Sequence, residues 1–271
     1  MTIRELLEII TDQLKSAGIT GARSDAEILV ADVLKQDKAW LLAHRDEKLT
    51  HAVTKKIQQL AHRRASREPM SYVLGHREFV GLDFKIDHRA LTPRVETETI
   101  VAEVAKRAPQ GTSLLDIGTG SGAMAIALKH LRPDMQVTAS EVSTEALDLA
   151  RENAARLLSA TDITFLNSDL FSNIPDQFDV IVANLPYVTR EMELMPEVQK
   201  EPDEALFGGA NDGLDLYRRF FEQLPPHLTV DAQVWIESDP WQQPALIKLA
   251  EATGLSPIFQ DYFILGFEKT S

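Results

Sequence analysis

Three glycines at alternate positions are the first feature of this sequence that could do chemistry. Gly118, Gly120 and Gly122 follow the apolar run Leu114–Ile117 and precede another, Ala123–Leu131. Glycine has no Cβ and adopts positive φ readily, so a ligand can approach such a turn closely. The helix that follows presents backbone N–H groups at its first turn. A plain strand-to-helix turn needs no such repetition, so we interpret the segment as a ligand site.

The residues around this turn predict a ligand that carries a ribose. Gly118, Gly120 and Ala123 fit the dinucleotide-binding fingerprint, and Glu141 follows Gly118 by 23 residues. An acidic side chain there accepts hydrogen bonds from ribose hydroxyls. Nicotinamide dinucleotides and S-adenosylmethionine both have this group. The additional Gly122 and the preceding Asp116 resemble the methyltransferase form of the turn, which holds the amino-acid tail of the cofactor.

Two further positions extend the predicted cofactor site. Asp169 and Leu170 follow the apolar run Ile163–Leu166, where such folds contact adenine. The carboxylate would accept from the amino group and Leu170 would pack on the ring; a surface aspartate without this role is the alternative. The predicted cofactor-binding residues are Asp116, Gly118, Thr119, Gly120, Ser121, Gly122, Glu141, Asp169, Leu170 and Asn184.

The tetrapeptide Asn184-Leu185-Pro186-Tyr187 follows the apolar run Val180–Ala183. Ligands of open α/β sheets bind at the carboxyl ends of strands, so this tetrapeptide should lie beside the cofactor. An amide or exocyclic amino nitrogen is a poor nucleophile because its lone pair is delocalised. The Asn184 oxygen and a backbone carbonyl can accept its two N–H groups and orient it toward a methyl donor. Tyr187 offers a flat face for a planar group. We predict catalytic roles for Asn184, Pro186 and Tyr187.

The elements that position these residues form two regions. Residues 1–70 predict a helical bundle, with capping boxes at Thr2/Glu5 and Ser24/Glu27. Strand-like composition from Tyr72 to Ile86 predicts a β-hairpin, so we assign 71–90 as a linker. From residue 91 to 271, helical and strand patterns alternate, which predicts an α/β fold with a mainly parallel sheet.

Composition excludes several classes of protein. The formal net charge is −13, which argues against sequence-independent binding to the phosphate backbone of nucleic acids. Cysteine is absent, and the seven histidines have no metal-binding spacing, so we expect no metal. No apolar run is long enough to span a membrane, and the first residues lack a signal-peptide pattern. We therefore expect a cytoplasmic protein without membrane contact.

Three segments carry a resemblance to one family along nearly the whole chain. The first runs from Arg63 through Glu78-Phe79, and the second is Pro93-Arg94-Val95-Glu96-Thr97-Glu98. The third runs from Glu201-Pro202 through Gly208-Gly209 and Asp212-Gly213-Leu214 to Tyr217-Arg218. Together they resemble the linker, the PRxETE signature and the active-site loop of the release-factor glutamine methyltransferases.

The resemblance implies a class I methyltransferase with a seven-stranded sheet and a helical substrate-recognition domain. It implies methyl transfer from S-adenosylmethionine, with S-adenosylhomocysteine as product, to the glutamine amide nitrogen in the Gly-Gly-Gln loop of peptide chain release factors. We expect a monomer that does not bind nucleic acid directly. The implied substrate-binding residues are Asn184, Leu185, Pro186, Tyr187, Arg94 and Glu98. A first-turn helix-stabilising role is the alternative for Glu96 and Glu98.

Two positions depart from the family's pattern. Leu185 stands where the family has proline, which removes a fixed φ and predicts modest loosening. Glu141 stands where aspartate is common, and it is longer by one methylene.

Three alternatives remain open. The tetrapeptide Asn-Leu-Pro-Tyr resembles that of ribosomal-RNA adenine dimethyltransferases, although only His62, Arg63, Arg64 and Arg67 form a basic cluster. We interpret that cluster as a solvated helix face, with a release-factor contact as the alternative. A glutamine of a ribosomal protein is a second possible substrate. A cofactor-binding module without catalysis is the third alternative, and Asn184 and Tyr187 argue against it.

Overall fold

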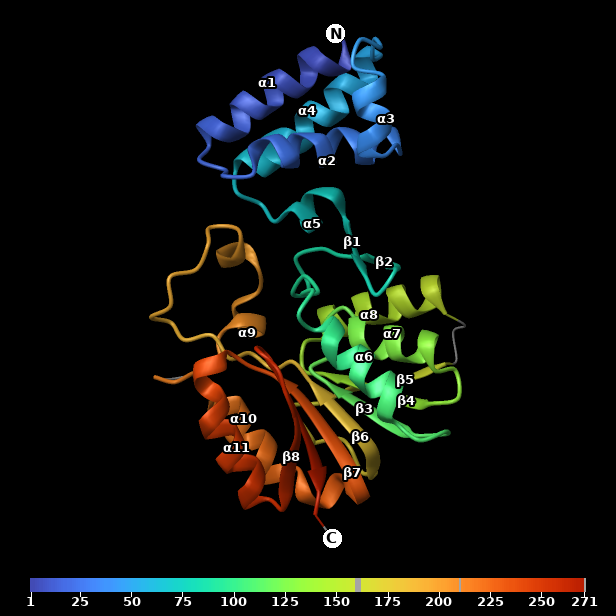
Figure 1. The fold of residues 1–271 in the computed structure, drawn as a ribbon, viewed down its shortest axis with the longest axis vertical. Helices are drawn as coiled ribbons and strands as arrows, with labels where there is room; N and C mark the ends of the chain where they lie inside the picture. The colour runs from blue at the N-terminus through green and yellow to red at the C-terminus, as the bar shows by residue number, and fades with distance from the viewer. Residues whose placement is uncertain (159–161, 210, 271) are drawn as a thin grey trace. The chain divides into compact units, whose positions relative to one another are not determined.

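The computed structural model describes residues 1–158, 162–209 and 211–270 (Figure 1). The chain divides into two units, one formed by Met1–His76 with Leu194–Lys200 and the other by Arg77–Glu193 with Glu201–Ser271. The assignment of 71–90 as a linker stays a prediction.

The first unit is helical, as the amphipathic patterns predict. Thr2 and Glu5 form the predicted capping box at the start of the first helix. The second helix begins earlier than predicted, after Gly21, so the capping box at Ser24 is wrong: the Gly21 carbonyl already accepts the N–H of Asp25. The elements are α1 (Ile3–Ser16), α2 (Ala22–Leu34), α3 (Lys38–Ala43), α4 (His51–Ala65), α5 (Met70–Leu74) and the 3₁₀ turn Val198–Lys200.

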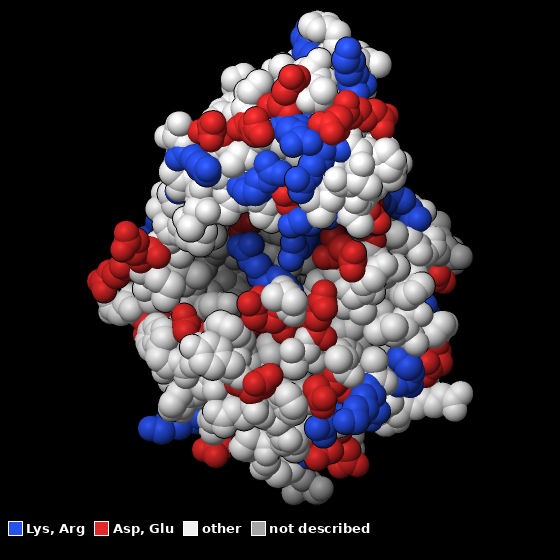
Figure 2. Space-filling model, turned by 45° about the horizontal axis from the view of Figure 1, so that its top comes forward, with Lys and Arg blue, Asp and Glu red and all other residues white. Residues whose placement is uncertain are grey.

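The basic cluster of the first unit is mostly paired with carboxylates. Arg64 is 8% exposed and contacts Asp25 at 2.7 Å and Glu197 at 2.9 Å. Arg67 also contacts Glu197, and Arg63 pairs with Glu68. The interpretation of this cluster as a solvated face is therefore wrong for Arg64, because its charge is neutralised inside the unit. Acidic and basic side chains are likewise interspersed over the face in Figure 2.

The predicted strand-like segment begins later than expected. Residues Met70–Leu74 form one helical turn because Pro69 opens it and Gly75, at φ +81°, closes it. Its side chains Tyr72 and Val73 are buried, which explains their apolar, strand-like appearance. The hairpin itself is formed by β1 (His76–Phe79) and β2 (Leu82–Lys85).

The second unit contains a seven-stranded mixed sheet in the order β5-β4-β3-β6-β7-β9-β8 within the described residues. All neighbouring strands are parallel except those paired with β9, which runs antiparallel to β7 and β8. The strands are β3 (Ser113–Ile117), β4 (Gln136–Glu141), β5 (Ile163–Asn167), β6 (Phe178–Ala183), β7 (Leu228–Glu237), β8 (Leu255–Gln260) and β9 (Ile264–Lys269).

Helices cover both faces of this sheet. Helices α10 and α11 pack on the face that carries Leu115, Ile181 and Val234, and α6, α7 and α8 lie together on the other side (Figure 1). The helices are α6 (Glu98–Arg107), α7 (Ala123–Leu131), α8 (Thr144–Leu157), α9 (Asp203–Leu206), α10 (Asp215–Gln223) and α11 (Gln243–Ala252), with 3₁₀ turns at Pro225–His227 and Pro240–Gln242. Within the described residues, no helix is long and apolar enough to cross a membrane.

Candidate active site

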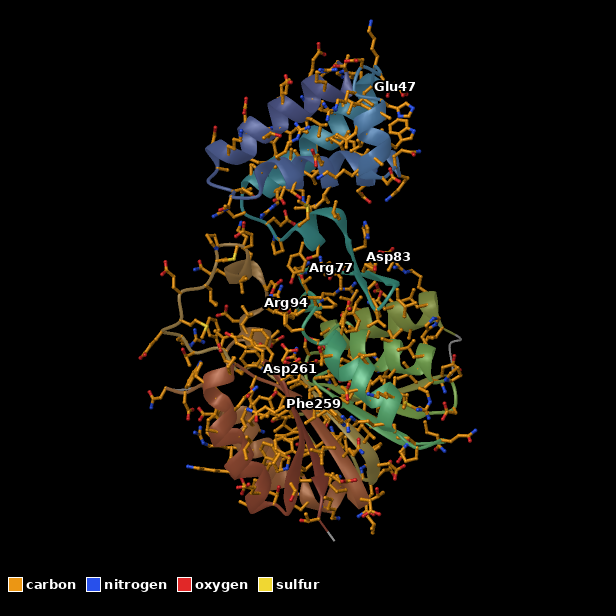
Figure 3. All side chains as sticks on the ribbon, in the orientation of Figure 1. Glu47, Arg77, Asp83, Arg94, Phe259 and Asp261 are labelled. Carbon is orange, nitrogen blue, oxygen red and sulfur yellow. The ribbon has the colours of Figure 1, made fainter. Side chains whose placement is uncertain are left out.

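A cavity opens at the carboxyl ends of β3, β4 and β6 in the second unit. It contains about 1050 Å³ of space, part of it open to solvent, a size that suits a small-molecule ligand. Arg94, labelled in Figure 3, is among its lining residues. The predicted site residues that line it are Arg94, Gly118, Thr119, Gly120, Ser121, Glu141, Asp169, Leu170, Asn184, Leu185 and Pro186. Asp116, Gly122, Tyr187 and Glu98 are not among its lining residues.

The glycine turn forms one wall of the cavity. Gly118 and Gly120 have φ values of +70° and +55°, which glycine adopts without strain. A Cβ on Gly118 would lie 3.1 Å from Leu185, whereas a Cβ on Gly120 would meet nothing within 4 Å and would enter the cavity space. The turn is held by the Ser140 carbonyl, which accepts the N–H groups of Gly118 and Thr119.

Two predicted cofactor residues lie behind this wall instead of in it. Gly122 has φ +83°, and a Cβ there would lie 2.8 Å from Ile126, so glycine is needed for packing. The buried Asp116 accepts the Thr119 hydroxyl at 2.7 Å and the Ala125 N–H at 3.1 Å. Asp116 and Gly122 therefore support the turn from behind, and the cofactor contacts expected of them stay a prediction.

The pH dependence of stability should report on the buried Asp116. Burial raises the pKa of Asp116 to about 7, whereas an unfolded aspartate titrates near about 3.9. Between these values the folded state holds a proton that the unfolded state has lost, so the free energy of unfolding falls as pH rises through this window. We expect wild type to lose stability between about pH 4 and pH 7 relative to Asp116→Asn, measured by denaturant unfolding. Parallel pH profiles would contradict this assignment.

Glu141 ends β4 and lies against the glycine turn. One carboxylate oxygen accepts from Gly120, and the other accepts from the backbone N–H groups of Val142 and Ser143. An ionised carboxylate has about four acceptor positions, so about one remains for a ribose hydroxyl. Burial raises the pKa of Glu141, although these three donors favour its charged form.

Asp169 and Leu170 line the same cavity from the loop after β5. One oxygen of Asp169 accepts from Arg219 at 2.7 Å, and the residue lines the cavity. Leu170 is 5% exposed, with φ +49°. The predicted adenine contacts remain predictions on this geometry.

The side chain of Asn184 ends a hydrogen-bonded chain that the sequence did not reveal. Its Nδ2 donates to Oγ1 of Thr97 at 3.2 Å, and Thr97 donates to Oε2 of Glu237 at 2.5 Å. Tyr187 donates to Oε1 of the same Glu237 at 3.1 Å. Burial raises the pKa of Glu237 while these donors oppose it, and burial raises the pKa of Tyr187 as well. The flat-face role of Tyr187 stays a prediction.

Signals for the two missed residues were present in the sequence. Thr97 lies inside the PRxETE-like segment, between Glu96 and Glu98. Glu237 ends β7, the strand next to β6, so the sheet order places it beside Asn184. That order is a tertiary property, and the alternating pattern alone does not supply it.

A hydrogen bond fixes the position where the family's proline is replaced. The N–H of Leu185 donates to the Tyr217 hydroxyl at 3.3 Å, and that hydroxyl donates to the Glu237 carbonyl at 2.5 Å. A proline at 185 would lack this donor. This bond, which the proline form cannot make, opposes the loosening expected from Leu185, and that loosening stays a prediction.

Leu185→Pro should change kcat by less than about fivefold, because the lost hydrogen bond and the gained rigidity are of similar size. Steady-state methylation kinetics of the two proteins test this. A large rise in turnover would show that Leu185 does loosen the site.

Gly208 and Gly213, in the predicted active-site loop, allow the backbone of this loop to pack closely against the backbone of Pro186 and Tyr187. A Cβ on Gly208 would lie 2.4 Å from the Pro186 carbonyl, and a Cβ on Gly213 would lie 2.2 Å from that of Tyr187. Gln242 joins the same loop by donating to the carbonyls of Tyr187 and Asp212. These close approaches give the Gly-Gly and Asp-Gly-Leu segments a physical reason: they hold the tetrapeptide in place.

The two charged residues predicted to bind substrate have different surroundings. Arg94 lines the cavity and pairs with Glu201, whose pKa burial raises despite the nearby guanidinium. Glu98 accepts the N–H of Val80 at 3.1 Å and so ties the hairpin to α6. Substrate contact by Arg94 fits this placement, and Glu98 has a bracing role in the second unit.

Comparisons with known proteins identify the family. The PrmC N-terminal domain family matches residues 5–75, and the methyltransferase small domain family matches residues 95–236. A release factor glutamine methyltransferase of Geobacter sulfurreducens is 37% identical over 95% of this chain and 91% of its own. The chain belongs to the release factor glutamine methyltransferase family. The Moorella thermoacetica member is 36% identical over 94% of this chain and 91% of its own.

A solved structure agrees on the fold. The chain resembles a methyltransferase from Pyrococcus furiosus with a TM-score of 0.54 and 20% identity, covering 70% of this chain and 90% of that one. At this identity the likeness concerns the class I methyltransferase fold.

The residues of the cavity fit S-adenosylmethionine, the cofactor that the family implies. Gly120 leaves open space where a side chain would stand, and Glu141 keeps about one acceptor position for a ribose hydroxyl. Within the described residues, no cluster of three His, Cys, Asp or Glu side chains is placed to hold a metal ion.

Proposed function

We propose that this protein transfers a methyl group from S-adenosylmethionine to the side-chain amide nitrogen of the glutamine in the Gly-Gly-Gln loop of peptide chain release factors. The observation that carries the proposal is the Asn184 carboxamide, which lines the cavity formed with Gly118 and Gly120. Membership of the family supports the same activity.

The chain's own residues would orient the substrate amide. S-adenosylmethionine, when bound, supplies an electrophilic methyl group on a sulfonium sulfur. The Asn184 Oδ1 and the Leu185 carbonyl would accept the two N–H groups of the glutamine amide and direct its nitrogen lone pair at that methyl. The new N–C bond would form as the S–CH₃ bond breaks, leaving a neutral thioether, and one proton then leaves the nitrogen for solvent. Positioning of this kind contributes several kcal/mol without a general base.

Adenine methylation in ribosomal RNA is the second candidate, favoured by the tetrapeptide Asn184–Tyr187. The charge of −13 and the pairing of Arg63, Arg64 and Arg67 with carboxylates argue against an RNA-binding surface there. We therefore place release factors first. We also propose that the enzyme acts in the cytoplasm, as a monomer, without binding nucleic acid directly.

One labelling experiment separates the candidates. The protein and methyl-labelled S-adenosylmethionine are incubated in four parallel reactions. Each reaction contains one substrate: a purified release factor, its loop Gln→Ala variant, ribosomal proteins or ribosomal RNA. We expect label in the wild-type release factor and none in the Gln→Ala variant. Label in RNA would support the second candidate. Label in a ribosomal protein alone would show that the substrate is that protein and not a release factor.

A further inference from the structure

The carboxylate of Glu237 lies at the centre of the contacts behind Asn184. Glu237 is the last residue of β7, and it is only 2% exposed. Oε2 accepts from Thr97 at 2.5 Å and Oε1 accepts from Tyr187 at 3.1 Å. Thr97 is itself 5% exposed and lines the cavity together with Asn184. The Asn184 side chain is a third donor to this carboxylate, and the three donors together oppose the effect of burial and favour the ionised form.

When Glu237 is ionised, the hydrogen bonds that link Asn184, Thr97 and Glu237 can have only one donor-to-acceptor direction. A carboxylate accepts and never donates, so the single O–H of Thr97 points at Glu237. The Thr97 oxygen then has only lone pairs for Asn184, and the Asn184 group at 3.2 Å must be the NH₂. The hydrogen bonds from Asn184 to Thr97 and from Thr97 to Glu237 therefore assign the nitrogen and the oxygen of the Asn184 amide. Oδ1 is left as the group that Asn184 offers to a ligand.

The orientation matters because the substrate is also an amide. If Oδ1 faces the glutamine, it accepts an N–H and orients the nitrogen. If the Asn184 amide were flipped, two NH₂ groups would face each other, and neither could accept. The same strand end is fixed through the backbone, because Tyr217 bridges the Leu185 N–H and the Glu237 carbonyl.

We propose that Thr97 and Glu237 are positioning residues that set the orientation of the Asn184 amide, so that its oxygen faces the substrate nitrogen. This inference rests on the proposed function. It assigns a role to the threonine of the PRxETE-like segment: its hydroxyl relays the direction of hydrogen bonding from a buried carboxylate to the residue that binds the substrate amide.

Thr97→Val and Thr97→Ser provide the test, because valine keeps the shape without the hydroxyl and serine keeps the hydroxyl. We expect Thr97→Val to lower kcat for release-factor methylation about 10- to 100-fold, as for loss of an oriented buried hydrogen bond. The dissociation constant for S-adenosylhomocysteine, measured by calorimetry, should stay unchanged. Thr97→Ser should restore kcat to near the wild-type value. Should the valine variant not fold, Thr97→Ala removes the same hydroxyl with less bulk.

Thr229→Val is the matched control. Its hydroxyl donates to the Asp179 carboxylate at 2.9 Å, so it removes another threonine–carboxylate bond of the same sheet, away from the cavity. It should leave kcat unchanged. Wild-type kcat in a folded Thr97→Val or Thr97→Ala protein would overturn the inference, as would failure of Thr97→Ser to restore activity. Absence of methylation by wild type would instead refute the proposed function.

Discussion

Asn184→Ala should lower kcat for methyl transfer by at least about 100-fold, the size seen when one oriented group is removed from a reacting centre. Alanine keeps the backbone of the tetrapeptide but offers no acceptor for the substrate amide. Cofactor binding should remain measurable, because the glycine turn and Glu141 do not depend on this side chain. Single-turnover methylation, together with calorimetric titration of S-adenosylhomocysteine, measures both effects.

The control for this variant is Asn173→Ala. Asn173 is exposed and donates its amide to the Asn167 carbonyl, and it does not line the cavity. It should retain wild-type turnover. Normal turnover in Asn184→Ala would remove the proposed catalyst, whereas lost cofactor binding would show that Asn184 serves the cofactor more than the substrate.

Gly120→Val should act on the cofactor instead of on the chemical step. A side chain at this position meets no protein atom within 4 Å and enters the cavity, so it would occupy space that the ligand needs. We expect cofactor binding to weaken by about 10- to 100-fold or more, as for overpacking a filled site. The dissociation constant for S-adenosylhomocysteine, again from calorimetry, measures this.

Backbone strain needs its own control, because valine at a positive φ is unfavourable wherever it stands. Gly111→Val supplies it: Gly111 has φ +75°, has no atom within 4 Å of its Cβ position, and lies outside the cavity. Both variants should lose similar stability, but only Gly120→Val should lose cofactor affinity. Equal affinity in the two variants would show that the glycine turn has only a structural role.

The fold of the second unit could be predicted because local patterns and tertiary burial agree there. The apolar runs Leu114–Ile117 and Val180–Ala183 became β3 and β6, and the glycine turn between β3 and α7 lies where the spacing placed it. Both strands are buried, so their composition is set by the core and is visible in the sequence.

Predictions failed where one composition suits two structures, and they stayed incomplete where a contact depends on tertiary neighbours. Tyr72 and Val73 look like strand residues, yet Pro69 and Gly75 close them into a helical turn. Asp116 and Gly122 belong to the motif, but the side of the turn that each faces depends on the packing of α7 and α8. A motif thus identifies the residues that a turn requires without separating those that touch the ligand from those that support it.

The position of Glu237 shows the same limit over a longer distance. It follows Asn184 by 53 residues and Thr97 by 140, and only the pairing of β6 with β7 brings the three together. Such an arrangement requires the sheet order, which is why the tetrapeptide was recognisable in the sequence and its support was not.

The most direct test of this account is a crystal structure of the protein with S-adenosylhomocysteine and a release-factor peptide that contains the Gly-Gly-Gln loop. We predict that the nucleoside lies over Gly118 and Gly120, and that the glutamine amide nitrogen lies within hydrogen-bond distance of Asn184, on the side away from Thr97. A glutamine bound elsewhere, or a nucleoside outside the cavity, would contradict it.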